Sequence, residues 1–368
     1  MKTKLHDLAG VGQSVWLDYI HRTLIHSGGL RDYVDKGLRG VTSNPTIFAD
    51  AITKSDVYDD QIHKLALDKK SPHEIYEELT VEDSRMAADI LRPVFDESDG
   101  NDGFFSLEVN PHLAHDKTGT INEALRLFKA VDRPNIMIKV PATEEGISAF
   151  KELTEEGINI NVTLMFSLAQ YDLVAEAFIS ALEKRVANVY NVKTIASVAS
   201  LFVSRVDTKV DKLLDALETP RASSLKGKIG IANAKMAYQR FKEFFQSERW
   251  EHLAEKGARV QRVLYGSTGT KNPDYSDVMY MDNLIGPNTI NTAPPETLEA
   301  FLDHGTVTLT LESNLDEARA QLEELAALGI DLDEVMHKLL MEGVEKFAQP
   351  YDALIEKITE KKADLIAT

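Results

Sequence analysis

Eight short apolar or alternating segments recur along the chain, and a stretch with helical spacing of apolar residues follows each of them. Eight successive strand–helix units are typical of a (β/α)8 barrel, the TIM-barrel architecture, rather than of an open doubly wound α/β sheet. We therefore predict a single α/β barrel domain over residues 1–368. The helical segment 314–368 is predicted to be a C-terminal extension that packs across a barrel face or makes oligomer contacts. The predicted strand segments are residues 14–20, 40–48, 104–111, 135–143, 160–166, 194–207, 259–268 and 288–293.

The charge and the missing cysteine exclude several classes of protein. The chain has 41 Lys and Arg against 59 Asp and Glu, a formal charge of −18. Nucleic acids and anionic membranes require a basic patch, so neither is expected as a partner. Without cysteine there can be no disulfide, thiolate metal site or cysteine nucleophile. The N-terminus lacks the features of a signal peptide and no apolar run is long enough to span a membrane, so we expect a cytoplasmic enzyme.

One lysine stands inside an otherwise apolar strand segment. In NIMIKVPAT, residues 135–143, Lys139 alternates with Ile136, Ile138 and Val140. A buried ammonium without a partner is so unfavourable that the group usually loses its proton instead. A strand lysine is more often an edge-strand charge, but this one has apolar neighbours on both sides and lies near the C-terminal end of its strand, where barrel active sites lie. We therefore interpret Lys139 as a catalytic amine.

Three other strands direct polar side chains to the same lumen, because successive strand residues point to opposite faces. Asp18 falls opposite Leu17 and Tyr19, and Glu108 lies between Leu107 and Val109. Asp18 could instead be a helix cap or a salt-bridge partner. In residues 158–166 the even-numbered apolar side chains are predicted to face the helices, namely Ile158, Ile160, Val162, Leu164 and Phe166. The alternate residues then face the lumen, with a chemical role or simply as filling: Asn159, Asn161 and Thr163.

A lysine with two carboxylates suits Schiff-base aldol chemistry. A lysine held among apolar groups can be a free amine near neutral pH and attack a ketone carbon. The protonated imine is an electron sink that lets the bond between the third and fourth carbons of a sugar break. One carboxylate takes the proton of the C4 hydroxyl, and the other moves protons while the imine forms. The ten histidines show no H-x-x-x-H or comparable carboxylate spacing, so a metal site is only weakly supported.

Seven segments together resemble the transaldolase family. They occur in family order and at family-like separations over nearly all of the chain: WLDYI, GVTSNPTIF, SLEVNP, IMIKVPAT, GININVTLMFS, VASLFVSRVD and YGSTGTKNP. The resemblance implies transfer of a dihydroxyacetone unit from sedoheptulose 7-phosphate to glyceraldehyde 3-phosphate, in the non-oxidative pentose phosphate pathway. It implies no cofactor and no metal, phosphorylated sugars as the binding partners, and a monomer or homodimer.

The same resemblance implies a role for each matching residue. Lys139 would form the imine, Asp18 would be the acid and base at the C4 hydroxyl, and Glu108 would act through a water held by Thr163. The dihydroxyacetone part of the substrate would be bound by Asn44, Asn161 and Ser200.

The substrate phosphate requires a cationic site on this acidic chain. Arg205 follows the sixth strand, and Ser267 and Lys271 follow the seventh, where barrels commonly hold phosphate. Many transaldolases carry an arginine shortly after the residue that matches Ser267, whereas this chain has Lys271, which we predict to be the second cationic ligand. The alternative is that Arg205 forms a surface ion pair with Asp207 or Asp211.

Three other functions fit the sequence less well. Fructose-6-phosphate aldolase, a close relative that releases free dihydroxyacetone, typically has Gln and Tyr where this chain has Glu108 and Phe202. A metal-dependent phosphosugar isomerase lacks support from ligand spacing, and a non-catalytic phosphosugar-binding protein would not need Lys139 and the carboxylates. STGTKNP is also similar to the branch that includes transaldolase–phosphoglucose isomerase fusions, but no isomerase half is expected in these 368 residues.

Overall fold

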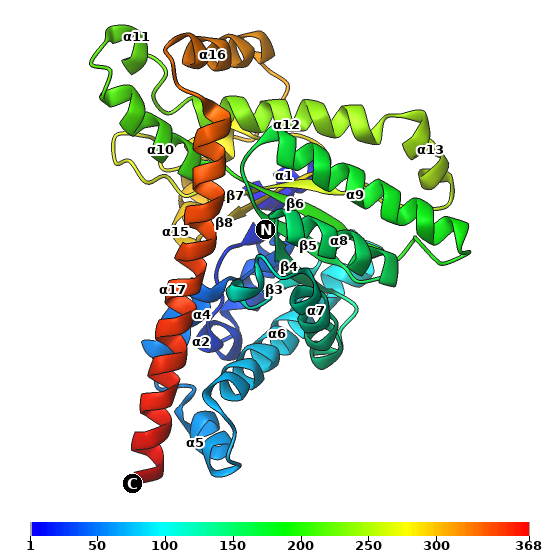
Figure 1. Ribbon diagram of the computed structural model, residues 1–368, viewed down its shortest axis with the longest axis vertical. Helices are drawn as coiled ribbons and strands as arrows, with labels where there is room; N and C mark the ends of the chain where they lie inside the picture. Colours follow the sequence, from blue (N-terminus) through cyan, green and yellow to red (C-terminus); the bar gives the residue numbers. More distant parts are fainter. Residues whose placement is uncertain (1, 368) are drawn as a thin grey trace.

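Eight parallel strands form a closed barrel in the computed structural model, which describes residues 2–367 (Figure 1). The strands pair in chain order, and the last closes on the first. This confirms the predicted (β/α)8 architecture, and each strand lies within, or begins one residue before, the segment predicted for it. The strands are β1 (Gln13–Leu17), β2 (Gly40–Thr42), β3 (Phe104–Glu108), β4 (Ile136–Pro141), β5 (Ile160–Met165), β6 (Ser197–Phe202), β7 (Arg262–Gly266) and β8 (Thr289–Ala293).

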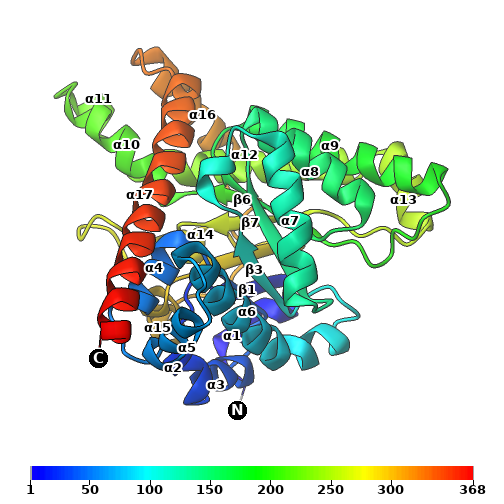
Figure 2. The ribbon, with the colours of Figure 1, turned by 60° about the horizontal axis from the view of Figure 1, so that its bottom comes forward.

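Helices surround the barrel, and Figure 2 shows three of them, α7, α8 and α9, packed side by side along its outside. The first part of the chain forms α1 (Lys4–Gly10), α2 (Arg22–His26), α3 (Gly29–Asp35), α4 (Pro45–Thr53), α5 (Asp59–Leu67), α6 (Pro72–Glu97), the short 3-10 helix η1 (Pro111–Leu113), α7 (Lys117–Val131) and α8 (Glu144–Glu156). The second part forms α9 (Leu168–Ala187), α10 (Ser204–Asp215), α11 (Pro220–Ser223), α12 (Ile229–Phe245), α13 (Glu248–Glu255), α14 (Met279–Asn283), α15 (Pro295–His304), α16 (Leu315–Ala327) and α17 (Leu332–Ala367).

The barrel lumen is filled in layers whose polarity differs along the barrel axis. At the N-terminal end Arg262 donates to Ser14 Oγ over 3.0 Å and to Asp102 Oδ1 over 2.9 Å. The middle layer is apolar and buried, and it consists of Trp16, Phe104, Met137, Val198, Leu264 and Ile290. Because side chains alternate along a strand, the residue two places beyond Met137 also faces the lumen, and that residue is Lys139. The apolar middle layer therefore separates the polar layer at the C-terminal end of the barrel from the N-terminal end.

The prediction that the even-numbered residues of this segment face the surrounding helices is correct for Ile158, Ile160 and Val162 and wrong for Leu164 and Phe166. Leu164 has a φ of 54°, and the pairing of β5 with β6 shifts register between Val162 and Met165. Met165, rather than Leu164, packs in the layer between barrel and helices. Leu164 and Phe166 instead join a separate apolar cluster with α10 and α17. The irregular residue thus moves the end of β5 toward the C-terminal helix.

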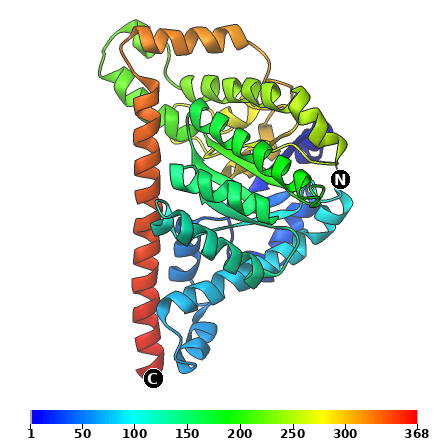
Figure 3. The same ribbon diagram turned by 45° about the vertical axis from the view of Figure 1, so that its right-hand side comes forward.

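The last two helices pack against different elements. In Figures 1 and 3, α17 runs as one long helix along the side of the molecule, and α16 lies beside α12. The contacts of α17 include α4, α5, α6, α10 and η1, together with β5. Since α4, α10 and η1 follow directly after strand ends, α17 lies across the C-terminal end of the barrel.

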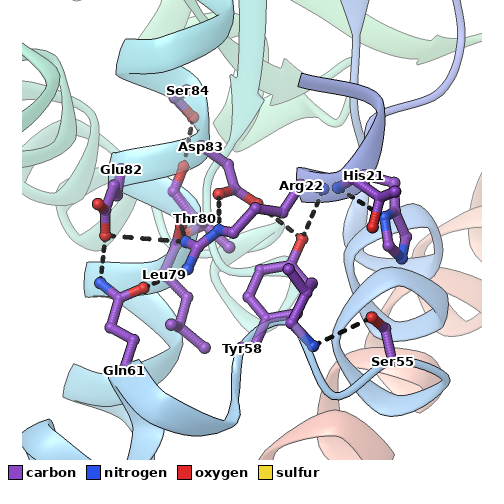
Figure 4. A network of polar contacts seen from close by, with 12 residues as sticks. His21, Arg22, Ser55, Tyr58, Gln61, Leu79, Thr80, Glu82, Asp83 and Ser84 are labelled. Carbon is purple, nitrogen blue, oxygen red and sulfur yellow. Dashed lines mark hydrogen bonds and ion pairs between the residues drawn. The ribbon is translucent and has the colours of Figure 1, made fainter. Parts of the chain in front are cut away.

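A buried polar network holds the connection that leaves β1 (Figure 4). Arg22 Nε donates to Asp83 Oδ1 over 2.7 Å, and the Tyr58 hydroxyl donates to Asp83 Oδ2 over 2.8 Å. The guanidinium carbon of Arg22 also lies 4.4 Å from the centre of the Tyr58 ring. The network joins α2, α6 and the segment before α5, and it fixes the loop in which Asp18 lies.

Candidate active site

Lys139 lies at the centre of the polar layer and is almost fully buried. Its side chain is 5% exposed, and its Nζ donates to the Ser43 carbonyl oxygen over 3.0 Å. The same nitrogen lies 3.4 Å from Glu108 Oε2. Strand register explains the arrangement, because Glu108 of β3 and Asn161 of β5 are the direct partners of Lys139 on either side.

Glu108 is a buried carboxyl group with a raised pKa. Removal from water raises its pKa to about 6, although the attraction of Lys139 opposes the shift, and the charge of Asp18 adds to it. Among the described residues, neither Glu108 Oε2 nor the buried Thr163 Oγ1 has a hydrogen-bond partner. Buried polar atoms are nearly always satisfied, so Thr163 Oγ1 is available to a ligand, and Glu108 Oε2 can accept a hydrogen bond in addition to its ion pair with Lys139.

Asp18 follows β1 directly and is held by a residue of the neighbouring strand β2. Thr42 donates its hydroxyl to Asp18 Oδ1 over 2.7 Å, and Thr42 Oγ1 lies 2.7 Å from Thr292 Oγ1. Removal from water raises the pKa of Asp18, and Lys139 is the nearby charge that most strongly opposes the rise. The alternatives of a helix cap or a salt bridge do not apply, because Asp18 accepts a hydrogen bond from a barrel threonine and α2 is capped by His21.

Of the three residues predicted to bind the dihydroxyacetone part, Asn161 and Ser200 belong to one chain of hydrogen bonds. Ser200 donates to Asn161 Oδ1 over 2.6 Å, and Asn161 Nδ2 donates to Ser106 Oγ over 3.2 Å. Asn44 is the N-cap of α4, where its Oδ1 accepts a hydrogen bond from the Ile47 amide over 3.0 Å. Its neighbour Ser43 supplies the carbonyl that binds Lys139.

The predicted phosphate ligands follow the C-terminal ends of β6 and β7. Arg205 is in the first turn of α10, and its guanidinium carbon is 5.0 Å from the Phe202 ring and 5.5 Å from the Phe347 ring. Ser267 follows β7 directly and has a φ of 54°, and its Oγ lies 2.9 Å from Ser204 Oγ. Lys271 is exposed on the following loop. Its charge has only a small effect on the pKa of Asp18.

The alternative of a surface ion pair for Arg205 is wrong, because both candidate carboxylates have other partners. Asp207 accepts from the Gly230 amide and the Tyr280 hydroxyl, over 2.7 and 2.9 Å. Asp211 accepts in the same way from the Gly227 amide and the Tyr275 hydroxyl, over 3.0 and 2.7 Å. These bonds fasten the loop that carries Lys271 to the helix that carries Arg205.

Sequence reasoning missed three site residues. Thr42 could have been found, because it alternates with the outward Val41 in β2. Ser43 acts through its backbone carbonyl, which has no signature in the side chain. Phe347 lies in a long helix, and nothing local marks the residue that reaches the barrel.

The described residues contain no set of three or more His, Cys, Asp or Glu side chains arranged to hold a metal ion. Of the helices described, none is both long and apolar enough to cross a membrane.

Comparison with known proteins gives one family. The family model described as "Transaldolase/Fructose-6-phosphate aldolase" matches residues 15–358. A protein named transaldolase from Trichodesmium erythraeum is 46% identical over 97% of both chains. Those from Thiobacillus denitrificans and Thermobifida fusca are 47% and 45% identical, covering 96% and 99% of this chain and 98% and 99% of the relatives.

Proposed function

Because this chain belongs to the transaldolase/fructose-6-phosphate aldolase family, we propose that its barrel transfers a dihydroxyacetone unit between phosphorylated sugars through an imine on Lys139. The chain is an enzyme of the transaldolase type, since its relatives carry that name over nearly their full length. The donor is sedoheptulose 7-phosphate and the acceptor glyceraldehyde 3-phosphate. Erythrose 4-phosphate and fructose 6-phosphate are the products, as in the pentose phosphate pathway.

The first half of the reaction forms the imine. The neutral amine of Lys139 attacks the C2 ketone of the donor, and the oxygen of that ketone becomes the carbinolamine hydroxyl. Glu108, acting through a water held at Thr163 Oγ1, carries protons until that hydroxyl leaves as water. The assignment is supported by the 3.4 Å between Lys139 Nζ and Glu108 Oε2 and by a pKa of about 6, which allows Glu108 to give and accept protons.

The second half breaks and remakes a carbon–carbon bond. Asp18 takes the proton of the C4 hydroxyl, the C3–C4 bond breaks with its electrons moving into the imine, and an aldehyde leaves. The enamine then adds to the aldehyde of the acceptor, Asp18 returns the proton, and water releases the new ketose. The support is that Asp18 follows β1 and is held by Thr42 of the neighbouring strand β2, whereas Glu108 belongs to β3.

The remaining residues orient the substrate. Asn44, Asn161 and Ser200 bind the hydroxyl groups of the dihydroxyacetone part, and the hydrogen bond from Ser200 to Asn161 fixes the amide orientation. Arg205 and Lys271 supply positive charge to the phosphate, and Ser267 supplies a hydroxyl donor.

The observation that carries this proposal is an amine with a 5% exposed side chain, placed between a carbonyl oxygen and a carboxyl group. The test is reduction with borohydride in the presence of fructose 6-phosphate, followed by peptide mass spectrometry. We expect one stable adduct, at Lys139. Lys235 is an internal control, because it is also largely buried but donates to the Ser313 carbonyl far from the lumen. An unmodified Lys139 would contradict the imine mechanism.

The family description also includes fructose-6-phosphate aldolase, and the products distinguish the two activities. With fructose 6-phosphate and erythrose 4-phosphate, a transaldolase forms sedoheptulose 7-phosphate. An aldolase would release free dihydroxyacetone even without an acceptor. We expect transfer to exceed release.

We also propose that the enzyme works in the cytoplasm, as a monomer or a homodimer. Light scattering after gel filtration gives the mass of the assembly, and cell fractionation gives its location. A larger assembly or a membrane-associated fraction would contradict the proposal.

A further inference from the structure

The guanidinium of Arg205 lies over two aromatic rings. Phe202 and Phe347 lie 5.0 and 5.5 Å from its central carbon. Its Nη1 is buried and has no hydrogen-bond partner among the described residues. The charges of Asp18 and Glu108 act on Arg205, but no ion pair within 4 Å joins it to either carboxylate.

This arrangement suits a residue that must bind an anion. A guanidinium carries its N–H donors in its own plane. An aromatic ring attracts a cation to the face of the ring and needs no hydrogen bond to do so. Two rings can therefore hold the group without using its N–H donors, and the buried Nη1 is left without a partner among the described residues. A carboxylate partner would do the opposite, because it would occupy the donors and compete with a phosphate. A buried donor left unpaired is costly, and an incoming anion removes that cost.

One of the two rings comes from the C-terminal helix. Phe347 is 3% exposed and lies in α17, far along the chain from α10. One helical turn before it, Gly343 packs against Leu164 at the end of β5. A Cβ atom at that position would lie 2.9 Å from Leu164 Cδ2 and 3.8 Å from Arg205 Nη1. Leu164, whose φ is 54°, therefore lies between the end of β5 and α17 at this point.

We propose that Phe347 is a positioning residue for substrate phosphate, and that α17 takes part in substrate binding by holding Arg205 against Phe202. This inference rests on the proposed function, in which Arg205 binds the phosphate. Without the ring of Phe347 the guanidinium would move between several orientations, and the phosphate would lose affinity. The amine, the carboxylates and the chemical step would be unaffected.

The decisive variants separate the aromatic face from the packing of the helix. Phe347→Leu removes the ring but keeps an apolar side chain, and Phe347→Tyr restores a ring. Leu339→Ala is the matched control, because Leu339 lies in α17 and in the same apolar cluster as Phe347 but has no aromatic ring for a cation–π contact. The measurements are KM and kcat for fructose 6-phosphate, and the inhibition constant of inorganic phosphate against that substrate.

We expect Phe347→Leu to raise both KM and the phosphate inhibition constant by roughly 3- to 30-fold, the range of a cation–π contact, with kcat changed less than about 2-fold. Phe347→Tyr should restore both constants. Leu339→Ala should lower the melting temperature without changing either constant. If Phe347→Leu melts below the assay temperature, Phe347→Met takes its place with the same expectation.

Two outcomes would overturn the inference: unchanged constants in Phe347→Leu, or the same rise in Leu339→Ala. The proposed function is tested separately by the adduct at Lys139 and by Arg205→Ala in an intact Phe347 background. If those two results are as expected and Phe347→Leu is silent, only the role of α17 is wrong.

Discussion

Lys139 and Glu108 are direct cross-strand partners, and Lys139 Nζ lies 3.4 Å from Glu108 Oε2 inside the barrel. Both side chains are 5% exposed. A buried ion pair contributes little net stability, because desolvation of the two charges offsets their attraction. Such a pair is therefore better explained by chemistry that needs an amine and a carboxyl group together than by folding.

Replacement of Lys139 should abolish turnover and leave the fold intact. Lys139→Met keeps a long side chain but has no amine, so kcat should fall by roughly 10³-fold or more. Lys139→Arg should be equally inactive, because a guanidinium stays protonated and does not add to a carbonyl. Circular dichroism should match the wild type in both variants. Wild-type-like turnover in either one would contradict the mechanism.

The two carboxylates should control different steps. Asp18→Asn should accumulate a ketose imine that can be trapped with borohydride but is not cleaved, because the C4 proton has no acceptor. Glu108→Gln should instead slow the formation and hydrolysis of the imine. The measurement is the rate of trapping against the rate of aldehyde release. Our assignment would be reversed if Asp18→Asn failed to form an imine while Glu108→Gln formed one at the normal rate.

The rate of imine formation should fall on the acid side with an apparent pKa near 6. Burial raises the pKa of Glu108 from 4.5 to about 6, so below that pH the group is protonated and cannot accept a proton. Since the charge of Asp18 contributes to the rise, Asp18→Asn should move the midpoint to lower pH. Dihydroxyacetone is the best carbonyl for this assay, because it has no phosphate that titrates in the same range. The acid limb should be absent in Glu108→Gln.

Strand parity predicted most of the site because the side-chain period of a strand is fixed. It placed Glu108, Lys139 and Asn161 in one lumen without any knowledge of their distances. Parity could not predict the end of β5, because a leucine with a φ of 54° is rare and depends on its contacts with the C-terminal helix.

The sequence also did not predict which residues of distant elements contact one another. The predicted extension 314–368 was expected to pack across a barrel face or to make oligomer contacts, and α17 does lie across the C-terminal end of the barrel. Which of its residues reaches Arg205 depends on the rotation and depth at which the helix packs. For the same reason, the partners of Asp207 and Asp211 could not be read from the chain, because both tyrosines come from the region after β7.

The carboxyl group of Asp207 should lower the stability of the protein as the pH rises. Burial raises its pKa from 3.8 to about 7, so between these values the folded state keeps a proton that the unfolded state has lost. Its contribution to the free energy of unfolding is therefore present at pH 4 and is lost by about pH 7. Asp207→Asn can keep both hydrogen bonds, with Tyr280 as the acceptor in one of them.

Asp207→Asn should accordingly raise the free energy of unfolding at pH 8, by between about 1 and 4 kcal/mol, and change it little at pH 4. The measurement is urea unfolding at the two pH values. Asp215→Asn is the control, because Asp215 lies on the same helix in an exposed pair with Lys226. It should change stability by less than about 0.5 kcal/mol. Equal effects of Asp207→Asn at both pH values would contradict the expectation.

Arg205 should govern the affinity for phosphorylated sugars and have little effect on unphosphorylated ones. Its buried Nη1 has no acceptor in the described part of the chain, and a phosphate oxygen would supply one. Loss of this charge-assisted hydrogen bond is worth roughly 1.5–3 kcal/mol, so Arg205→Ala should raise KM for fructose 6-phosphate by about 10- to 200-fold. Trapping of dihydroxyacetone on Lys139 should proceed at nearly the normal rate.

Two further variants separate the phosphate site from a general loss of positive charge. Lys271 is exposed and screened by solvent, so Lys271→Ala should raise KM only about 2- to 5-fold if the lysine is the second cationic ligand. Arg240→Ala removes an arginine that pairs with Glu243 on the outer helix α12 and should have no effect on KM. If Arg205→Ala impaired both substrate classes equally, Arg205 would be structural, because a residue that only binds phosphate cannot affect a substrate without one.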